Sequence, residues 1–154
     1  MKTNEIIFQD IDNQRNVDFW YTLISAEPVM DSAKKDDWVG ETIYEIYHKN
    51  NLVGFISYSR WGDAYCLSCI YILSAYRNQG IATAAIRKLA YQLKSKTKNF
   101  YGFVHKDNAN AIKMYHGLGF KYLNQARFGY IYENPNDDCA ITDDGFYEFG
   151  KVLV

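Results

Sequence analysis

The sequence predicts a mixed α/β fold: a mostly antiparallel sheet of about six or seven strands, flanked by helices. Segments with strand-like and helix-like spacing of apolar residues follow one another in the order β-α-β-β-β-α-β-α-β-β. The strand at 64–73 is apolar nearly throughout, which is typical of a central strand covered on both faces. A helix separates it from the strand at 99–104, so we expect these two to be parallel, with a right-handed crossover.

The individual elements are read from periodicity and from breakers. Val17, Trp20, Tyr21 and Ile24 have helical spacing, and Pro28 ends that helix. Helices are expected at 13–26, from the 77–82 turn to about residue 98, and at 108–118. Strands are expected at 5–8, 41–48, 52–59, 64–73, 99–104, 120–132 and 146–153.

The length of 154 residues favours one domain over residues 1–154, and a hydrophobic content of 48% is enough for a substantial core. No apolar run approaches the roughly 20 residues that span a bilayer, and no signal-peptide core is visible. The net charge of -1 gives no general attraction to nucleic acid or to an anionic membrane. We therefore expect a cytoplasmic protein that binds neither, as a monomer or a homodimer.

The Cys66-x-x-Cys69 pair could indicate a redox or metal site. Both residues fall in a strand, where three-residue spacing turns the side chains to opposite faces. No second pair of Cys or His residues completes a metal site. Buried structural cysteines and no bound metal are therefore expected.

Charge is unevenly distributed along the chain. Between Ser74 and Lys113 eight residues are basic and only Asp107 is acidic, whereas 128–150 contains six acidic residues and no basic one. The first stretch suits an anion and the second a cation. Two solvated faces that merely keep the protein soluble remain an alternative for either stretch.

The turn Arg77-Asn78-Gln79-Gly80-Ile81-Ala82 joins the central strand to a helix. Small residues here leave the first N–H groups of the helix unpaired, at the positive end of the helix dipole. This pattern predicts a site for phosphate or pyrophosphate.

Two blocks resemble signatures of the GNAT superfamily of N-acetyltransferases. The turn is similar to the R-x-x-G-x-A acetyl-CoA signature, and Asn108-x-x-Ala111-x-x-Met114-Tyr115-x-x-x-Gly119-Phe120 resembles N-x-x-A-x-x-L-Y-x-x-x-G-F, with Met for Leu. The resemblance covers about 64–122 well. It implies a GNAT-like sheet in which one parallel strand pair splays at the cosubstrate site.

The resemblance also implies residue roles and a cosubstrate, acetyl-CoA. Backbone groups of Ile72 and the side chain of Asn108 would bind the pantetheine arm, and Tyr115 would be the general acid for the CoA thiolate. The pyrophosphate would be held by a longer set: Arg77, Asn78, Gln79, Gly80, Ile81, Ala82 and Thr83. Each role has a plainer alternative: Arg77 as a surface residue, Asn108 as a helix N-cap, and Tyr115 as a packing residue.

The sequence departs from the family in two places. Many relatives carry a glutamate on the central strand as base for the incoming ammonium, and 66–73 contains no acidic residue. The base is left open among Glu41, Glu45, Asp63, His105 and water. Asn78 replaces a frequent glycine, and asparagine tolerates the left-handed backbone such a turn needs.

The expected function is acetyl transfer from acetyl-CoA to a primary amine of a small molecule or peptide, by direct attack in a ternary complex. The acceptor is expected to be cationic, drawn by acidic stretches at 36–37, 137–138 and 143–144. The alternative is a non-catalytic domain that binds or senses acyl-CoA.

Overall fold

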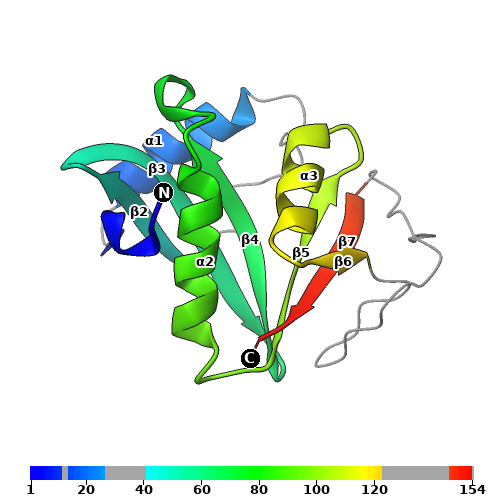
Figure 1. Cartoon of the computed structure of the whole chain (residues 1–154). Coiled ribbons are helices and arrows are strands. Elements are labelled where there is room, and N and C mark those ends of the chain that lie inside the picture. The colour runs from blue at the N-terminus through cyan, green and yellow to red at the C-terminus, as the bar shows by residue number, and fades with distance from the viewer. Residues whose placement is uncertain (12–13, 27–40, 123–145, 154) are drawn as a thin grey trace. The chain divides into compact units, whose positions relative to one another are not determined.

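The computed structural model describes residues 1–11, 14–26, 41–122 and 146–153 (Figure 1). Its strands follow the hydrogen-bonded order β1-β2-β3-β4-β5-β7-β6. The pairs β1–β2, β2–β3, β5–β7 and β6–β7 are antiparallel, whereas β4 and β5 are parallel. The predicted mixed, mostly antiparallel sheet with helices is therefore confirmed. The elements are β1 (Ile6–Asp10), α1 (Gln14–Ser25), β2 (Thr42–His48), β3 (Asn51–Trp61), β4 (Ala64–Ile72), α2 (Ile81–Leu93), β5 (Asn99–His105), α3 (Ala109–Gly117), β6 (Lys121–Tyr122) and β7 (Phe146–Val152).

The chain forms two compact units. The first comprises Met1–Ser59 and Cys69–Lys88, and the second comprises Arg60–Ser68 and Leu89–Val154. Strands β3 and β4 and helix α2 pass from one unit into the other. The first unit contains β1, β2 and most of β3, and the second contains β5, β6, β7 and α3.

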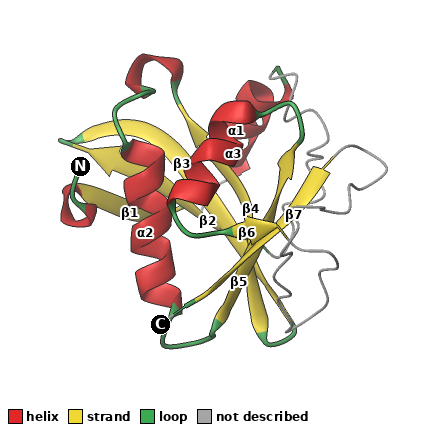
Figure 2. Cartoon of the chain, turned by 45° about the vertical axis from the view of Figure 1, so that its right-hand side comes forward, coloured by secondary structure: helices red, strands yellow, loops and turns green. Residues whose placement is uncertain are grey.

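In the first unit, α1 packs on one face of the β2–β3 hairpin (Figure 2). Trp20 and Ile24 from the helix are fully buried against Phe55 and Tyr71. The carboxylate of buried Glu45 on β2 accepts hydrogen bonds from Trp20 Nε1 at 3.3 Å and from Asn16 Nδ2 at 3.0 Å. These two bonds satisfy a charge that would be costly to bury alone, and they fix α1 on the strand.

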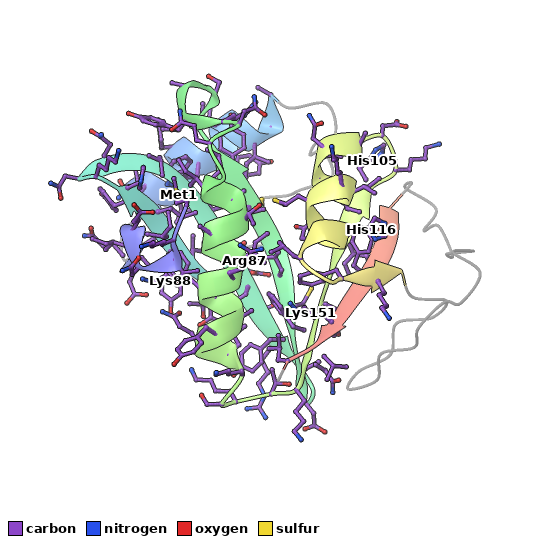
Figure 3. The ribbon with its side chains drawn as sticks, in the orientation of Figure 1. Met1, Arg87, Lys88, His105, His116 and Lys151 are labelled. Carbon is purple, nitrogen blue, oxygen red and sulfur yellow. The ribbon has the colours of Figure 1, made fainter. Side chains whose placement is uncertain are left out.

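Strand β1 is joined to the middle of α2 by Lys88. Its Nζ donates to the carbonyl of Ile6 at 2.5 Å and lies 5.5 Å from the ring of Phe8 (Figure 3). The Phe8 ring in turn stacks on Tyr44 of β2, with centroids 5.2 Å apart. A lysine that satisfies a strand carbonyl and covers an aromatic ring holds the middle of α2 against β1.

Gly54 permits a close approach of β3 to the end of β4. A Cβ on this residue would lie 2.1 Å from the carbonyl oxygen of Tyr71 and 3.1 Å from Cα of Ile72. Beside it, Leu73 N–H donates to the Val53 carbonyl at 2.8 Å, which is the last bond before the chain leaves the strand. An isolated glycine in a strand pattern signals such an approach, and the sequence reading overlooked it.

In the second unit, β7 lies between β5 and β6, although it is the last strand in the sequence. It pairs with β5 along seven residue pairs, from Asn99↔Val152 to His105↔Phe146. The rings of Phe100, Tyr115, Phe120 and Phe149 form a buried cluster between this sheet and α3, with centroids of neighbouring rings 5.3–5.5 Å apart. Aromatic pairs at this spacing stabilise beyond their area burial.

The structure corrects some element boundaries. Helix α2 ends at Leu93 and not near residue 98, because Thr97 leaves the helix: its hydroxyl donates to the Asp63 carbonyl at 2.6 Å and accepts from Asn99 N–H at 3.1 Å. Of the strand expected at 120–132, only Lys121–Tyr122 is described. The remainder, the 27–40 loop and the acidic segment before Phe146 lie outside the described residues.

We expect Gly54→Ala to lower the free energy of unfolding by about 1–3 kcal/mol, the usual cost of forcing extra atoms into a packed site. The added methyl group meets backbone and not a flexible side chain, so β3 and β4 must separate. Urea unfolding monitored by circular dichroism measures the change. Gly117→Ala is the matched control, since nothing lies within 4 Å of a Cβ there, and it should leave stability unchanged or raise it. Equal stabilities for both variants would contradict the close approach.

Candidate active site

The turn between β4 and α2 has the backbone conformation of an anion-binding loop. After the 3₁₀ turn Ser74–Tyr76, Asn78 has φ 62° and Gly80 has φ 80°. Both therefore adopt the left-handed conformation, which confirms the expectation that Asn78 can replace glycine there. Alternating handedness turns successive N–H groups toward one side, as in the backbone concavities that bind anions.

Six consecutive amides of this turn have no acceptor among the residues that the structure describes. Within the described part of the chain, none of the N–H groups of residues 78–83 donates to a backbone or side-chain atom. The first intrahelical bond of α2 runs from Ala84 N–H to the Gly80 carbonyl at 3.0 Å. The amides of Ile81, Ala82 and Thr83 are thus the donors that a helix start leaves for capping groups, water or a ligand.

Arg77 folds back onto the end of β4. Its Nε donates to the Ile72 carbonyl at 2.8 Å, and its guanidinium carbon lies 5.2 Å from the centroid of the Tyr71 ring. This contact orders the strand end from which the turn departs. The carbonyl of Ile72 retains a second lone pair for another donor.

Asn108 is the N-cap of α3. Its Oδ1 accepts from Ala111 N–H at 3.2 Å, and its carbonyl accepts from Ile112 N–H at 3.0 Å. The capping role considered from sequence is therefore confirmed. Since only Oδ1 is used, the two N–H donors of the side-chain amide have no described protein acceptor and can serve a ligand.

Tyr115 lies two turns along the same face of α3, roughly 10 Å from Asn108 at 1.5 Å per residue. Its side chain is 8% exposed and its ring is held by Phe120 and Phe149, each with its centroid 5.3 Å away. The structure thus groups Asn108 with Tyr115 in the second unit. It groups Ile72 with Arg77 and residues 78–83 in the first unit.

Glu45 and Asp63, two of the four candidate bases, have surroundings that assign them other roles. The carboxylate of Glu45 is buried and engaged by Trp20 and Asn16. Asp63 is exposed in the turn that precedes β4, nine residues before Ile72, or roughly 30 Å along an extended strand.

His105 ends β5, and its Nδ1 accepts from Asp107 N–H at 3.1 Å. The same nitrogen lies 3.7 Å from Asp107 Oδ2, an ion pair that would require its protonation. Asp107 therefore contacts the Nδ1 side of the ring through both its backbone N–H and its carboxylate.

Glu41 precedes β2, and its carboxylate lies close enough to Cys69 on β4 to affect that thiol. Burial, and to a smaller extent the negative charge of Glu41, together raise the pKa of Cys69 to about 12. Cys66, by contrast, is buried with Ala64 and Tyr101 in the second unit. Both cysteines are free thiols, as expected from their strand spacing.

Among the described residues, no three His, Cys, Asp or Glu side chains gather in a group that could hold a metal ion. No helix there combines the length and apolar character needed to cross a membrane.

Comparison with known proteins identifies the family. The model of the acetyltransferase (GNAT) family matches residues 9–120, so the chain belongs to the GNAT acetyltransferases. It is an acyltransferase, and the family resemblance read from the two sequence blocks is confirmed. A search of curated proteins gave no match.

Solved structures share the fold at low sequence identity. A GNAT family acetyltransferase from Elizabethkingia anophelis with acetyl-CoA bound has a TM-score of 0.70 and 14% identity, over 97% of this chain and 99% of that one. The ribosomal-protein-S18-alanine N-acetyltransferase of Escherichia coli has a TM-score of 0.68 and 17% identity, over 96% and 94%. The spermidine N-acetyltransferase of Vibrio cholerae, in complex with CoA and spermine, has a TM-score of 0.69 and 12% identity, over 97% and 96%.

We expect Cys69 to resist alkylation in the native protein. With a pKa of about 12, on the order of one thiol in a thousand is ionised at pH 9, whereas an ordinary cysteine is mostly thiolate there. Iodoacetamide labelling between pH 8 and 10, with the site read by mass spectrometry, should give a rate at least about 100-fold below that of free cysteine.

The variant Glu41→Gln separates electrostatics from steric shielding in this experiment. Loss of the charge lowers the Cys69 pKa, so labelling should accelerate, and Asp63→Asn, which removes an exposed carboxylate from the turn before β4, should change nothing. Labelling of wild-type Cys69 at the rate of free cysteine would contradict the raised pKa of its thiol. Equal labelling rates in Glu41→Gln and Asp63→Asn would contradict the contribution of Glu41.

Proposed function

We propose that this chain transfers the acetyl group of acetyl-CoA to a primary amine of a small molecule or peptide, by direct attack within a ternary complex. The observation that carries the proposal is the run of unoccupied amides at residues 78–83, on a turn with two left-handed residues. In a GNAT acetyltransferase, such a turn matches the pyrophosphate of the cosubstrate in charge and in hydrogen-bond demand.

We assign the remaining parts of acetyl-CoA to groups that can make a further hydrogen bond. The free lone pair of the Ile72 carbonyl and the side-chain N–H groups of Asn108 suit the amides and carbonyls of a pantetheine arm. The side chain of Arg77 reinforces the strand end, and its positive charge favours the nearby phosphates. Gly80 supplies the backbone conformation that aims the amides, because most residues with a Cβ resist φ of 80°.

The chemistry needs one proton donor and no covalent enzyme intermediate. The neutral amine attacks the thioester carbon, a C–N bond forms, and the C–S bond breaks as the tetrahedral intermediate collapses. The departing CoA thiolate takes the phenolic proton of Tyr115, and the tyrosinate regains a proton from solvent. The surplus proton of the amine leaves to water or to a carboxylate. Cys69 is excluded as a nucleophile by the high pKa of its thiol.

The acceptor is proposed to be a cation or to be carried on one. Two of the three solved structures are named as a spermidine N-acetyltransferase and as a ribosomal-protein-S18-alanine N-acetyltransferase, so proteins with this fold include enzymes for small and for protein-borne amines. Support in this chain is the acidic composition of 128–150, of which 128–145 lie outside the described residues. A panel of polyamines, aminoglycosides and peptide amines, assayed for CoA thiol release, identifies the acceptor class.

One observation favours the alternative of a non-catalytic acyl-CoA sensor: β4 carries no carboxylate, and Glu45 is held by α1. The same assay discriminates the two functions. Binding of acetyl-CoA without acetylation of any amine in the panel would favour the sensor and reject the enzyme.

Gly80→Val is expected to weaken acetyl-CoA binding by at least about 100-fold, since a β-branched residue is strained at this φ and the amides turn away. Only the Cβ of Met1, at 3.8 Å, lies near a Cβ at this position, so the fold should persist. Isothermal calorimetry measures affinity, and circular dichroism checks folding. The control Asn78→Gly keeps the left-handed conformation and should bind normally. Unchanged affinity of Gly80→Val would reject the pyrophosphate assignment.

Tyr115→Phe should lower kcat by roughly 10²–10⁴, the range for loss of a general acid, with the KM for acetyl-CoA little changed. The ring and its packing against Phe120 and Phe149 are retained, so the loss is specific to the hydroxyl group. Steady-state kinetics with the best amine of the panel provides the measurement. A kcat within twofold of wild type would show that Tyr115 only packs.

A further inference from the structure

Strand β7 carries two side chains that contact the C-terminal end of α3. Phe149 and Lys151 are two residues apart, so both side chains lie on the same face of the strand. Neither was selected from the sequence, because the contacts join residues more than 30 positions apart.

Lys151 caps the C-terminal end of α3. Its Nζ donates to the Leu118 carbonyl at 2.7 Å, and Figure 3 shows Lys151 beside that end of the helix. Carbonyls at a helix C-terminus lack intrahelical donors and carry the negative pole of the dipole. An ammonium at this place satisfies both the hydrogen bond and the charge.

The turn whose carbonyl Lys151 binds is also hydrogen-bonded to the backbone of Tyr115. The carbonyl of Tyr115 accepts from Leu118 N–H at 3.1 Å and from Phe120 N–H at 3.0 Å. The reversal between them is made by Gly119, with φ 87°. Fixing the Leu118 carbonyl therefore fixes the backbone from which the tyrosine ring projects.

Phe149 confines the ring. Its centroid lies 5.3 Å from that of Tyr115, in a tilted arrangement, and 5.6 Å from the ring of His116. Phe120 contacts Tyr115 edge-to-face from the chain segment that Lys151 caps. Two rings and one capped turn thus leave the phenol little rotational freedom.

We propose that Lys151 is a positioning residue for Tyr115, through which β7 sets the place of the phenolic hydroxyl. The inference rests on the proposed role of Tyr115 as proton donor. Rates depend steeply on such placement, because a shift of about 1 Å at a reacting group can cost on the order of 10²-fold.

The variant Lys151→Met tests the proposal, since it keeps the length of the side chain and removes the donor and the charge. We expect kcat to fall about tenfold while the KM for acetyl-CoA changes less than about twofold. Lys151→Arg, which restores a cationic donor, should recover most of the rate. The matched control is Lys113→Met, which replaces an exposed lysine of α3 and should have the kcat of wild type. Circular dichroism verifies that each variant is folded, and Lys151→Gln serves as a polar, uncharged second variant.

A double-mutant cycle separates positioning from general destabilisation. In the Tyr115→Phe background no hydroxyl remains to be placed, so adding Lys151→Met should lower kcat less than about twofold further. An equal loss in both backgrounds would overturn the proposal, as would a wild-type kcat for Lys151→Met alongside a slow Tyr115→Phe. A wild-type kcat for Tyr115→Phe itself would instead reject the proton-donor role, and with it this inference.

Discussion

The end of strand β4 is the constraint on which the candidate site depends. The strand must stop abruptly and release a turn whose amides face outward, yet the backbone groups behind it must stay satisfied. Three contacts achieve this: Leu73 N–H bonds to the Val53 carbonyl, Arg77 Nε bonds to the Ile72 carbonyl, and Gly54 allows the two strands to approach. With that end fixed, the left-handed residues that follow can leave the amides of residues 78–83 to a ligand.

Much of this region could be predicted from local sequence. Asn78 was expected to tolerate a left-handed backbone, and Asn108 was recognised as a possible N-cap, whereas the anion site at the R-N-Q-G-I-A turn stays a prediction. These features are local because φ preference and capping depend on a residue and its immediate neighbours. The family followed for the same reason, since both signature blocks are short and contiguous.

The features that escaped prediction all depend on pairing between distant segments. Local spacing cannot show that β7 pairs with β5 and so places Lys151 and Phe149 beside α3. Nor can it show that Glu45, one of the candidate bases, lies under Trp20 and Asn16. Local sequence does not distinguish a strand carboxylate that a helix covers from one that contacts substrate, because burial is decided by elements elsewhere in the chain.

The proposed pyrophosphate turn and the proposed proton donor are held by different kinds of interaction, and this predicts different tolerance to change. In the proposed function the turn binds through backbone amides, so its ligand contact would depend on φ at residues 78 and 80 and little on the side chains there. The proposed role of Tyr115 uses a side chain, whose position depends on a ring and a lysine contributed by strand β7. Substitutions that keep backbone handedness should leave cosubstrate binding intact, whereas packing changes under α3 should reduce turnover before they reduce affinity. Donor binding and proton donation can therefore vary independently in this chain.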